Sequence, residues 1–394
     1  MDTNDFLGSF AQENVLFQTT VVKSARVGDN FYKAMIFVEN TRYVDSTTAD
    51  WAAVPGTTGI KALSVNASDY AENTSGLLQS WLYDLFCNGF TGDCILVACG
   101  DNIDTAGDPA VTAATFIEGM TAAYNALKAY AYHKTVCAGE EAASGVSVDS
   151  TVAVALAQLC AADKGLLSAA PYYPYATSSP AQPTSDTLYS AVKASGYDAF
   201  FSAHQDVTRN AALYSLGLAM STLNGSGTCV GSSFDMTKSS NITASGPDGT
   251  NLSKDIRSGL KALNIQTFKP VGDNTGAVAA IGASTLNGDV VQATWIIAYV
   301  TYMTKVAIAQ LITTPNFLKN SANYARILAV LSEYLGKFGP SGSGRLEDLA
   351  ITAPGFGALP EANGDQIIID NAWSAQYVDQ VREVQITGTL YIGA

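Results

Sequence analysis

Two histidines, His133 and His204, are the side chains of this 394-residue chain that could act as general bases near neutral pH. His204 lies in the run SAHQD, two residues before Asp206, and an Asp–His pair can activate a hydroxyl group or a water molecule in a hydrolase. The simpler interpretation, which we favour, is a histidine that faces solvent at the end of a strand. The sequence has no G-x-S-x-G elbow and no G-x-x-x-x-G-K-[ST] phosphate loop. A hydrolase that uses His204 and Asp206 is therefore an alternative, and the prediction is no enzyme.

Metal-binding spacing is also absent from the sequence. Three aspartates lie between residues 101 and 108, but their spacing matches no EF-hand, and a solvated acidic loop explains them better than a weak calcium site. Cys87, Cys94 and Cys99 contain no C-x2-C pair and have no histidine nearby, which excludes the usual zinc pattern. We therefore expect no metal and no cofactor.

Whether the cysteines could form disulfides depends on whether their side chains are exposed. Cys94, Cys99 and Cys160 lie in apolar runs and are expected to be core residues. Cys137 and Cys229 lie in polar, glycine-rich surroundings and are better candidates for exposure. In an oxidising medium these two could form disulfides between subunits, although inert thiols are the simpler interpretation.

Composition favours a subunit of an assembly. Charged residues make up 14% of the chain, against a usual value of about 25%, so the chain has little of the solubilising surface on which a free monomer relies. The net charge of −14 argues against a nucleic-acid partner, because phosphate binding needs clustered lysine and arginine. A neutral polar surface of this kind suits burial against other subunits.

No targeting or membrane segment is expected. The N-terminus (MDTNDFLGSF) has neither the basic nor the apolar region of a secretory signal. The longest apolar stretch, residues 290–312, contains Gln292, Lys305 and Gln310, and this pattern indicates a buried helix instead of a membrane span. Synthesis and folding in a cytoplasm is the default expectation.

Helical and strand patterns alternate from about residue 60, which is typical of an α/β layered domain. The clearest strand signal is at the end of the chain, where VREVQITGTLYI (residues 381–392) alternates apolar and polar side chains. A strand at a chain end must be held by a sheet, its own or a neighbour's. The predicted helices are 75–86, 109–132, 149–160, 185–195, 208–223, 252–263, 289–314 and 322–338, and the predicted strands are 13–23, 31–38, 94–99, 199–203, 265–271, 277–283, 348–352, 366–370 and 382–392.

The C-terminal third carries a recognisable combination of motifs. These are DNAW at residues 370–373, Tyr377, and VREVQITGTLYI at residues 381–392, preceded by the two helical segments WIIAYVTYMTKVAIAQLI and ANYARILAVLSEYLGKFG, which are joined through TTPNF. Over residues 289–394 the sequence resembles the contractile tail sheath proteins of bacteriophages, in particular the compact family with a C-terminal DNAW…VREV…GTLYI signature. The two helices resemble the paired helices of the sheath core domain.

The resemblance implies a structural role. A sheath subunit polymerises as stacked hexameric rings around a tail tube and contracts to drive the tube into the host envelope. The implied partners are other copies of the chain, the tail tube protein, and baseplate and tail terminator proteins, with no nucleic acid and no membrane. The implied location is the virion tail, after assembly in the host cytoplasm.

The implied fold class is α/β (α+β), with four parts. Residues 1–30 would form an N-terminal arm with a linking strand, and residues 31–251 an outward-facing α/β layered domain. Residues 252–380 would form a sheath-type core domain with a helical hairpin and a small mixed sheet, and residues 381–394 a C-terminal arm strand. Arms of this kind add strands to sheets of neighbouring subunits, and they keep neighbours linked while the subunit bodies move.

The resemblance also implies which residues would contact the tube and which would link subunits. The helical hairpin and the run RLED lie where a sheath core domain faces the tube, and mixed charges there would make a weak, breakable contact. Another virion or secretion-tube assembly protein stays open, although a tube protein would be mostly β. The subunit-linking residues would be Val15, Phe17, Thr19, Val21, Val384, Ile386, Leu390 and Ile392, and the tube-facing candidates would be Arg345, Glu347 and Asp348.

Overall fold

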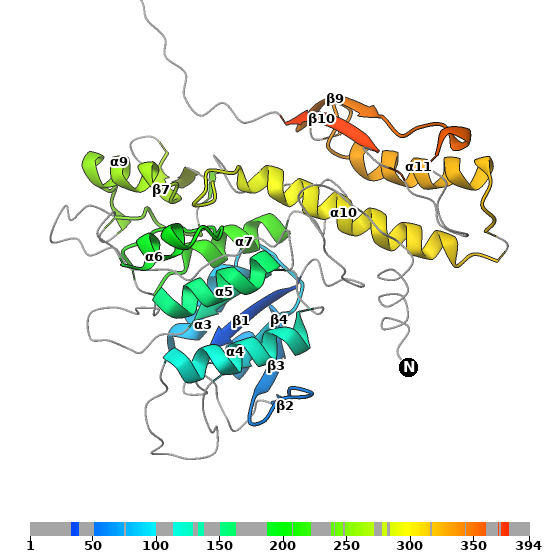
Figure 1. Cartoon of the computed structure of the whole chain (residues 1–394). Coiled ribbons are helices and arrows are strands. Elements are labelled where there is room, and N and C mark those ends of the chain that lie inside the picture. The colour runs from blue at the N-terminus through cyan, green and yellow to red at the C-terminus, as the bar shows by residue number, and fades with distance from the viewer. Residues whose placement is uncertain are drawn as a thin grey trace, which may run out of the picture.

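The chain combines helices and strands in the predicted α/β class, with a layered lobe and a long helical hairpin that extends from it (Figure 1). The computed structural model describes residues 33–38, 51–74, 76–99, 113–128, 133–137, 150–162, 187–206, 208–221, 238–239, 241–246, 249–271, 278–281, 284–315, 317–342, 344–359, 369 and 372–377.

A five-stranded sheet forms the centre of the layered lobe. Its strands are β1 (Ala34–Val38), β2 (Ala52–Ala53), β3 (Lys61–Val65), β4 (Cys94–Ala98) and β5 (His133–Cys137), in the order β2-β3-β4-β1-β5. β1 pairs in parallel with β4 and β5, whereas β3 pairs antiparallel with β2 and β4. Parallel strands need cover on both faces, which explains the wholly apolar sequences of β1 and β4.

Side chains of β1 divide between two cores because neighbouring residues of a strand point to opposite faces. Ala34, Ile36 and Val38 belong to the core on one face, and Met35 and Phe37 belong to the core on the other. All five residues are buried. The sheet is therefore a layer between two hydrophobic cores, as the apolar run predicts.

Helices cover the two faces of the sheet (Figure 1). α3 (Gly76–Phe86) and α7 (Ala211–Ser221) supply the first core and pack against each other. α4 (Ala113–Leu127), α5 (Ser150–Ala162) and α6 (Thr187–Ser195) supply the second.

A smaller antiparallel sheet lies in sequence between the helix α7 of the layered lobe and the helical hairpin. It contains β6 (Lys238–Ser239), β7 (Thr267–Pro270) and β8 (Val278–Ile281) in the order β6-β8-β7. α9 (Lys254–Ala262) precedes β7, and its first turn is capped by the Ser253 side chain, which accepts a hydrogen bond from the Ile256 N–H. Two short helices, α2 (Tyr70–Asn73) and the 3-10 turn η6 (Phe356–Ala358), complete the described helices.

The hairpin consists of α10 (Val291–Ile312) and α11 (Ser321–Gly336), which pack along each other (Figure 1). Among the described helices, α10 is long and apolar enough to cross a membrane by length and composition. Its Trp295, Ile296 and Tyr299 are nevertheless buried in the same core as α3, α7 and the sheet. α10 thus packs as the predicted core helix.

Several elements differ from the sequence-based prediction. β3, β5 and β10 (Trp373–Tyr377) are strands that the pattern does not reveal, and α4 is shorter than the predicted helix 109–132. In place of a strand at 199–203, an isolated parallel bridge joins Ser202 to Gln266. The predicted strands 13–23 and 382–392 lie outside the described residues, as does 366–370 apart from Ile369.

Candidate assembly surface

The hairpin carries a two-stranded antiparallel sheet made of β9 (Leu346–Ile351) and β10. Leu346 is buried, and Leu349, Trp373, Ala375 and Tyr377 pack against the core that the hairpin shares with the layered lobe. The side chains that alternate with them in β10 are exposed. One face of the small sheet is therefore anchored and the other is open, as in antiparallel sheets with one solvated face.

An irregularity shapes β9. Ser374 pairs with Ala350, but the next described pair is Gln376 with Glu347, so β9 has one residue more than β10 between them. Asp348 lies in this bulge with φ of 50°, a left-handed conformation that aspartate tolerates better than most residues. A bulge bends its strand and re-aims side chains, and bulges are frequent at sheet edges and functional sites.

Both strands of this sheet are edge strands in the part of the chain that the structure describes. Two strands are barely stable in isolation, and here packing on α11 and a hydrogen bond from the Leu346 N–H to the Phe338 carbonyl (2.8 Å) hold them. An edge strand presents unpaired N–H and C=O groups that can bind an added strand. The β9–β10 sheet can therefore receive a strand by main-chain hydrogen bonding.

The tube-facing candidates all lie at this sheet. Arg345, half-buried, immediately precedes β9, and Glu347 and Asp348 are exposed on it. The structure thus brings the three residues together at one edge of the hairpin, with Glu347 opposite Gln376. Their contact with a tube stays a prediction.

The proposed linking residues of the two arms lie outside the described residues. Cys229 also lies outside them, and only the backbone of Cys137 is described, as the last residue of β5. Cys94, Cys99 and Cys160 are buried, which confirms the core assignment, and burial raises the pKa of the Cys94 and Cys99 thiols far above the usual range. Thiols of this kind are poor nucleophiles.

His204 does not face solvent as predicted. Its side chain is fully buried, and Nε2 lies 3.3 Å from the Thr243 carbonyl oxygen, because residues 241–246 pass over it. Nδ1 accepts a hydrogen bond from the backbone N–H of Asp206 (3.0 Å). Burial lowers the pKa of His204 to about 4, so the ring is neutral at physiological pH.

The geometry at His204 does not form the Asp–His pair that hydrolysis would need. The Asp206 carboxylate accepts hydrogen bonds from the Thr208 N–H (2.9 Å) and the Thr208 hydroxyl (2.7 Å). Since Nδ1 of His204 is an acceptor, it cannot donate to that carboxylate. Among the described residues, no three His, Cys, Asp or Glu side chains lie close enough together to hold a metal ion.

A buried ion pair that the sequence does not reveal lies close to His204. The fully buried Asp84 of α3 binds Nη2 of Arg209 (2.5 Å) and accepts a hydrogen bond from the Asn210 N–H (2.6 Å). Arg209 also donates to the Asn241 carbonyl oxygen (2.6 Å). Burial raises the pKa of Asp84 to about 7, although the Arg209 charge opposes this. These contacts tie three segments that are distant in sequence to one another.

Comparison with known proteins bears on the fold. No protein-family model matches the chain, and no curated protein matches it significantly. A chain in the cryo-EM structure of the anti-feeding prophage (AFP) baseplate, 6-fold symmetrised, is similar over 96% of this chain and 97% of its own length, with a TM-score of 0.57 and 12% sequence identity. At this identity the likeness shows a shared fold, and it extends over nearly the whole of both chains.

Proposed function

We propose that this chain is a non-enzymatic structural subunit of a contractile phage tail or phage-tail-like particle, and specifically its sheath protein. In this role, copies of the chain form stacked hexameric rings around a tail tube and contract to drive the tube into a host envelope. The observation that carries the proposal is the fold likeness to a chain of a phage-like baseplate structure, which covers nearly the full length of both chains. The sheath-like motifs at residues 370–392 support the finer assignment.

The β9–β10 sheet gives the proposal a joining mechanism. Its anchored face fixes it to the hairpin, and its edges offer main-chain groups to strands from other subunits. We propose that residues 13–23 and 381–394 of neighbouring copies supply these strands, with side chains such as Val384 and Ile386 in pockets on the receiving sheet. The four-part division at residues 30, 251 and 380 belongs to the same proposal.

The tube contact is proposed at the edge of the hairpin. Arg345, Glu347 and Asp348 lie together there. Glu347 and Asp348 are exposed and negatively charged, and Arg345 is positively charged. Exposed ion pairs contribute roughly 0–1 kcal/mol each, so a contact made by such residues breaks easily when the sheath moves. The other proposed partners are the baseplate and tail terminator proteins, and the proposed location is the virion tail after assembly in the host cytoplasm.

A baseplate component is the second candidate, because the similar chain belongs to a baseplate structure. The two roles predict different products from the purified chain. A sheath protein should polymerise into tubes or stacked rings of many layers, whereas a baseplate component should stop at one closed ring or need a second protein.

Negative-stain electron microscopy of the purified full-length chain tests the proposal. Tubes of constant diameter support the sheath, and single rings support the baseplate component. A protein that stays monomeric at all concentrations, or that hydrolyses a substrate with a dependence on His204, contradicts both.

A further inference from the structure

Two segments of the chain close over the His204 ring. Residues 204–206 carry the ring, and residues 241–246 cover it. The Gln205 N–H donates a hydrogen bond to the Ser245 carbonyl oxygen (3.0 Å), which joins the two segments directly. We call these two segments together the clasp.

The hydrogen bonds of the clasp require a neutral ring. Nδ1 of His204 accepts a hydrogen bond from the Asp206 N–H (3.0 Å), so the ring proton lies on Nε2. Nε2 faces the carbonyl oxygen and the hydroxyl oxygen of Thr243, each 3.3 Å away. The neutral ring therefore bonds to both segments of the clasp.

A protonated ring does not fit this geometry. The second proton would lie on Nδ1 and point at the Asp206 N–H, so two donors would face each other across 3.0 Å. The charge would also be held away from water, because the His204 side chain is fully buried. Both costs disappear when the two segments separate and water reaches the ring.

Charged groups near the ring act in opposite directions. The Asp206 carboxylate favours the protonated ring and the Arg209 guanidinium disfavours it, but burial has a larger effect than either and lowers the pKa of His204 to about 4. Asp84, the partner of Arg209, has a pKa of about 7. In acid it is neutral, so it no longer offsets the Arg209 charge near the ring.

The other elements around the clasp do not change their charge in acid. Residues 241–246 contain no ionisable side chain. Burial raises the pKa of Tyr214 in α7 and of Cys87, which follows α3, so both side chains are neutral in acid. Lys269 of β7 is exposed and positively charged throughout. Protonation of His204 is therefore the change that acts on the hydrogen bonds of the clasp.

The clasp is weakly held at two points. Both polar atoms of the Gln205 side chain are buried without a hydrogen-bond partner in the described part of the chain, and opening would hydrate them. The hydrogen bonds of Asn241, from Arg209 Nη2 (2.6 Å) and to Asn88 Oδ1 (3.1 Å), are exposed to solvent. Segments with such contacts open locally at a lower cost than global unfolding.

Each segment of the clasp also has an anchored end. The Ser245 N–H donates to the Phe268 carbonyl oxygen (3.0 Å), and the Phe268 N–H donates to the Ser245 hydroxyl (2.7 Å). Immediately before the other segment, the Ala203 N–H donates to the Gln266 carbonyl oxygen (2.8 Å). The two segments can thus separate between fixed points.

We infer that the clasp opens in acid, because protonation of the His204 ring separates residues 204–206 from residues 241–246 while the rest of the chain stays folded. The opening breaks the hydrogen bonds that the Gln205 and Asp206 N–H groups donate, and it leaves the anchored ends in place. A buried histidine acts in this way as a switch that responds to pH. The inference does not rest on the proposed function, since it concerns a single copy of the chain.

Hydrogen–deuterium exchange of the full-length chain between pH 6.5 and pH 3.5 tests the inference. Each rate is corrected for the intrinsic effect of pH on amide exchange, and fragmentation in the mass spectrometer resolves single amides. The protection of the Gln205 and Asp206 N–H groups should fall at least tenfold as the pH falls to 4. The anchored N–H groups of Ala203 and Ser245 should stay within twofold.

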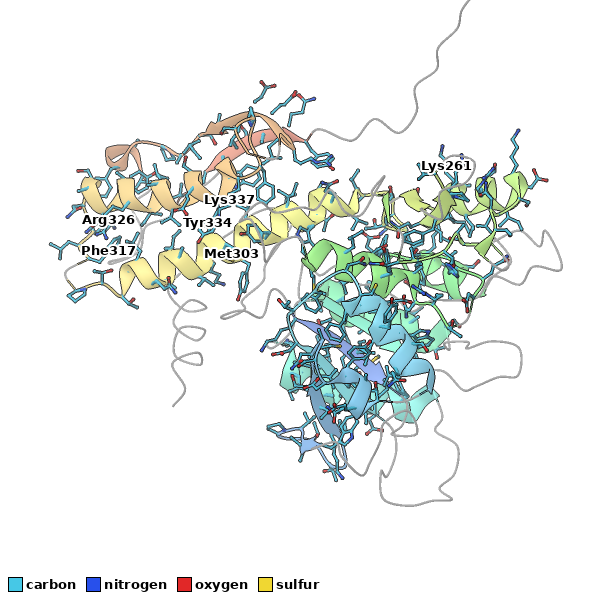
Figure 2. All side chains as sticks on the ribbon, turned by 180° about the vertical axis from the view of Figure 1, so that it is seen from behind. Lys261, Met303, Phe317, Arg326, Tyr334 and Lys337 are labelled. Atoms are coloured by element: carbon cyan, nitrogen blue, oxygen red, sulfur yellow. The ribbon has the colours of Figure 1, made fainter. Side chains whose placement is uncertain are left out.

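The helix α11 is the reference for global unfolding. Figure 2 shows its Arg326 and Tyr334 on the hairpin, far from Lys261 of α9, the helix that follows residues 241–246 in sequence. The amides of α11 should keep their protection at the pH at which the clasp opens.

A matched pair of variants assigns the opening to one ring. His204→Gln keeps a donor and an acceptor but does not titrate, so its clasp should stay closed down to pH 4. His133→Gln makes the same change at the other histidine of the chain and should open like wild type. If circular dichroism shows that His204→Gln misfolds, the ring titration of His204 is measured by nuclear magnetic resonance in His133→Gln, and its midpoint should match that of the opening.

Three results would overturn the inference. The first is protection of the Gln205 and Asp206 N–H groups that persists to pH 3.5 or falls only together with that of α11. The second is a folded His204→Gln variant that opens at the same pH as wild type. The third is a ring titration whose midpoint differs from that of the opening by more than one pH unit.

Discussion

The Asp84 carboxylate lies 2.5 Å from Nη2 of Arg209, which ties α3 to the loop that precedes α7. The Asp84 side chain is fully buried, at 0% exposure, whereas the Arg209 side chain is half-buried, at 19%. Removing one partner of such a pair leaves a desolvated charge, so the pair matters more for keeping these segments in place than for net stability.

The first prediction concerns the pH dependence of stability that Asp84 causes. Its pKa is about 7 in the folded chain and near 4 in an unfolded chain, so between these values the folded state binds a proton that the unfolded state does not. The stabilising contribution of Asp84 is therefore full below pH 4 and is lost as the pH rises through 7. Between pH 5 and pH 8, wild type should lose roughly 1–3 kcal/mol of unfolding free energy relative to Asp84→Asn.

Urea unfolding at pH 5, 6, 7 and 8 measures this difference. Asp206→Asn is the matched control, because the Asp206 carboxylate is exposed and contacts Thr208. The opposite slope, in which wild type gains stability with rising pH relative to Asp84→Asn, would show that the Arg209 charge outweighs burial.

The second prediction concerns His204 and has the opposite sign. Burial lowers its pKa to about 4, whereas an unfolded histidine titrates near 6.5, so the unfolded state takes up the proton first as the pH falls. The contribution of His204 is present above pH 6.5 and is lost as the pH falls toward 4. From pH 6.5 to pH 4.5, wild type should lose roughly 1–3 kcal/mol relative to His204→Asn.

Nuclear magnetic resonance gives a direct check on His204. The chain has two histidines, so the variant His133→Gln leaves the His204 ring as the single imidazole signal. A midpoint near 6.5 in the folded protein would contradict the buried position of the ring.

The third prediction concerns the contact between α3 and α7. A Cβ at Gly217 would overlap the backbone carbonyl group of Leu85, so Gly217→Ala must push the two helices apart. We expect a loss of about 1–3 kcal/mol in unfolding free energy. Gly336→Ala is the control, because a Cβ there has open space and a helical glycine costs about 0.5–1 kcal/mol relative to alanine. Thermal unfolding of both variants measures the difference, and Gly217→Ala should have the lower transition temperature. Equal transition temperatures would refute the close packing of α3 against α7.

The fourth prediction separates folding from assembly. Deleting residues 381–394 should leave the layered lobe and the hairpin folded, because among the described residues the cores of both already contain many large buried side chains. The truncated chain should keep its circular dichroism spectrum and its transition temperature within a few degrees, and it should fail to polymerise in sedimentation assays. Unfolding of the truncated chain would mean that the terminal strand belongs to its own core.

Local patterns predict much of this fold. Residues 291–312 and 321–336 form helices where the apolar periodicity places them, and residues 94–98 form a strand because an apolar run of that length needs cover on both faces. β5 escapes detection because HKTVC alternates too little. β10 does alternate, but the five residues WSAQY are a short signal, and three of them are small or polar. Each segment becomes a strand by pairing with another strand, β1 for β5 and β9 for β10.

His204 and the Asp84–Arg209 pair also show that local sequence patterns do not predict contacts between distant segments. His204 has polar neighbours in sequence, which suggests exposure, but Thr243 and the residues around it cover the ring. The Asp84–Arg209 pair joins positions that no periodicity connects. By contrast, the exposed Glu347 and Asp348 could be foreseen as surface residues from the run RLED, while the bulge that aims them depends on the register with β10.

One hydrophobic core runs from Leu96 in the central sheet through Trp295 of α10 to Leu335 of α11 and Leu346 of β9. A hinge between the layered lobe and the hairpin would expose these side chains to water, at about 25 cal/mol per Å² of apolar surface. The shared core therefore opposes bending between the hairpin and the layered lobe. If copies of the chain assemble as proposed, movement between them is therefore expected at the contacts between subunits.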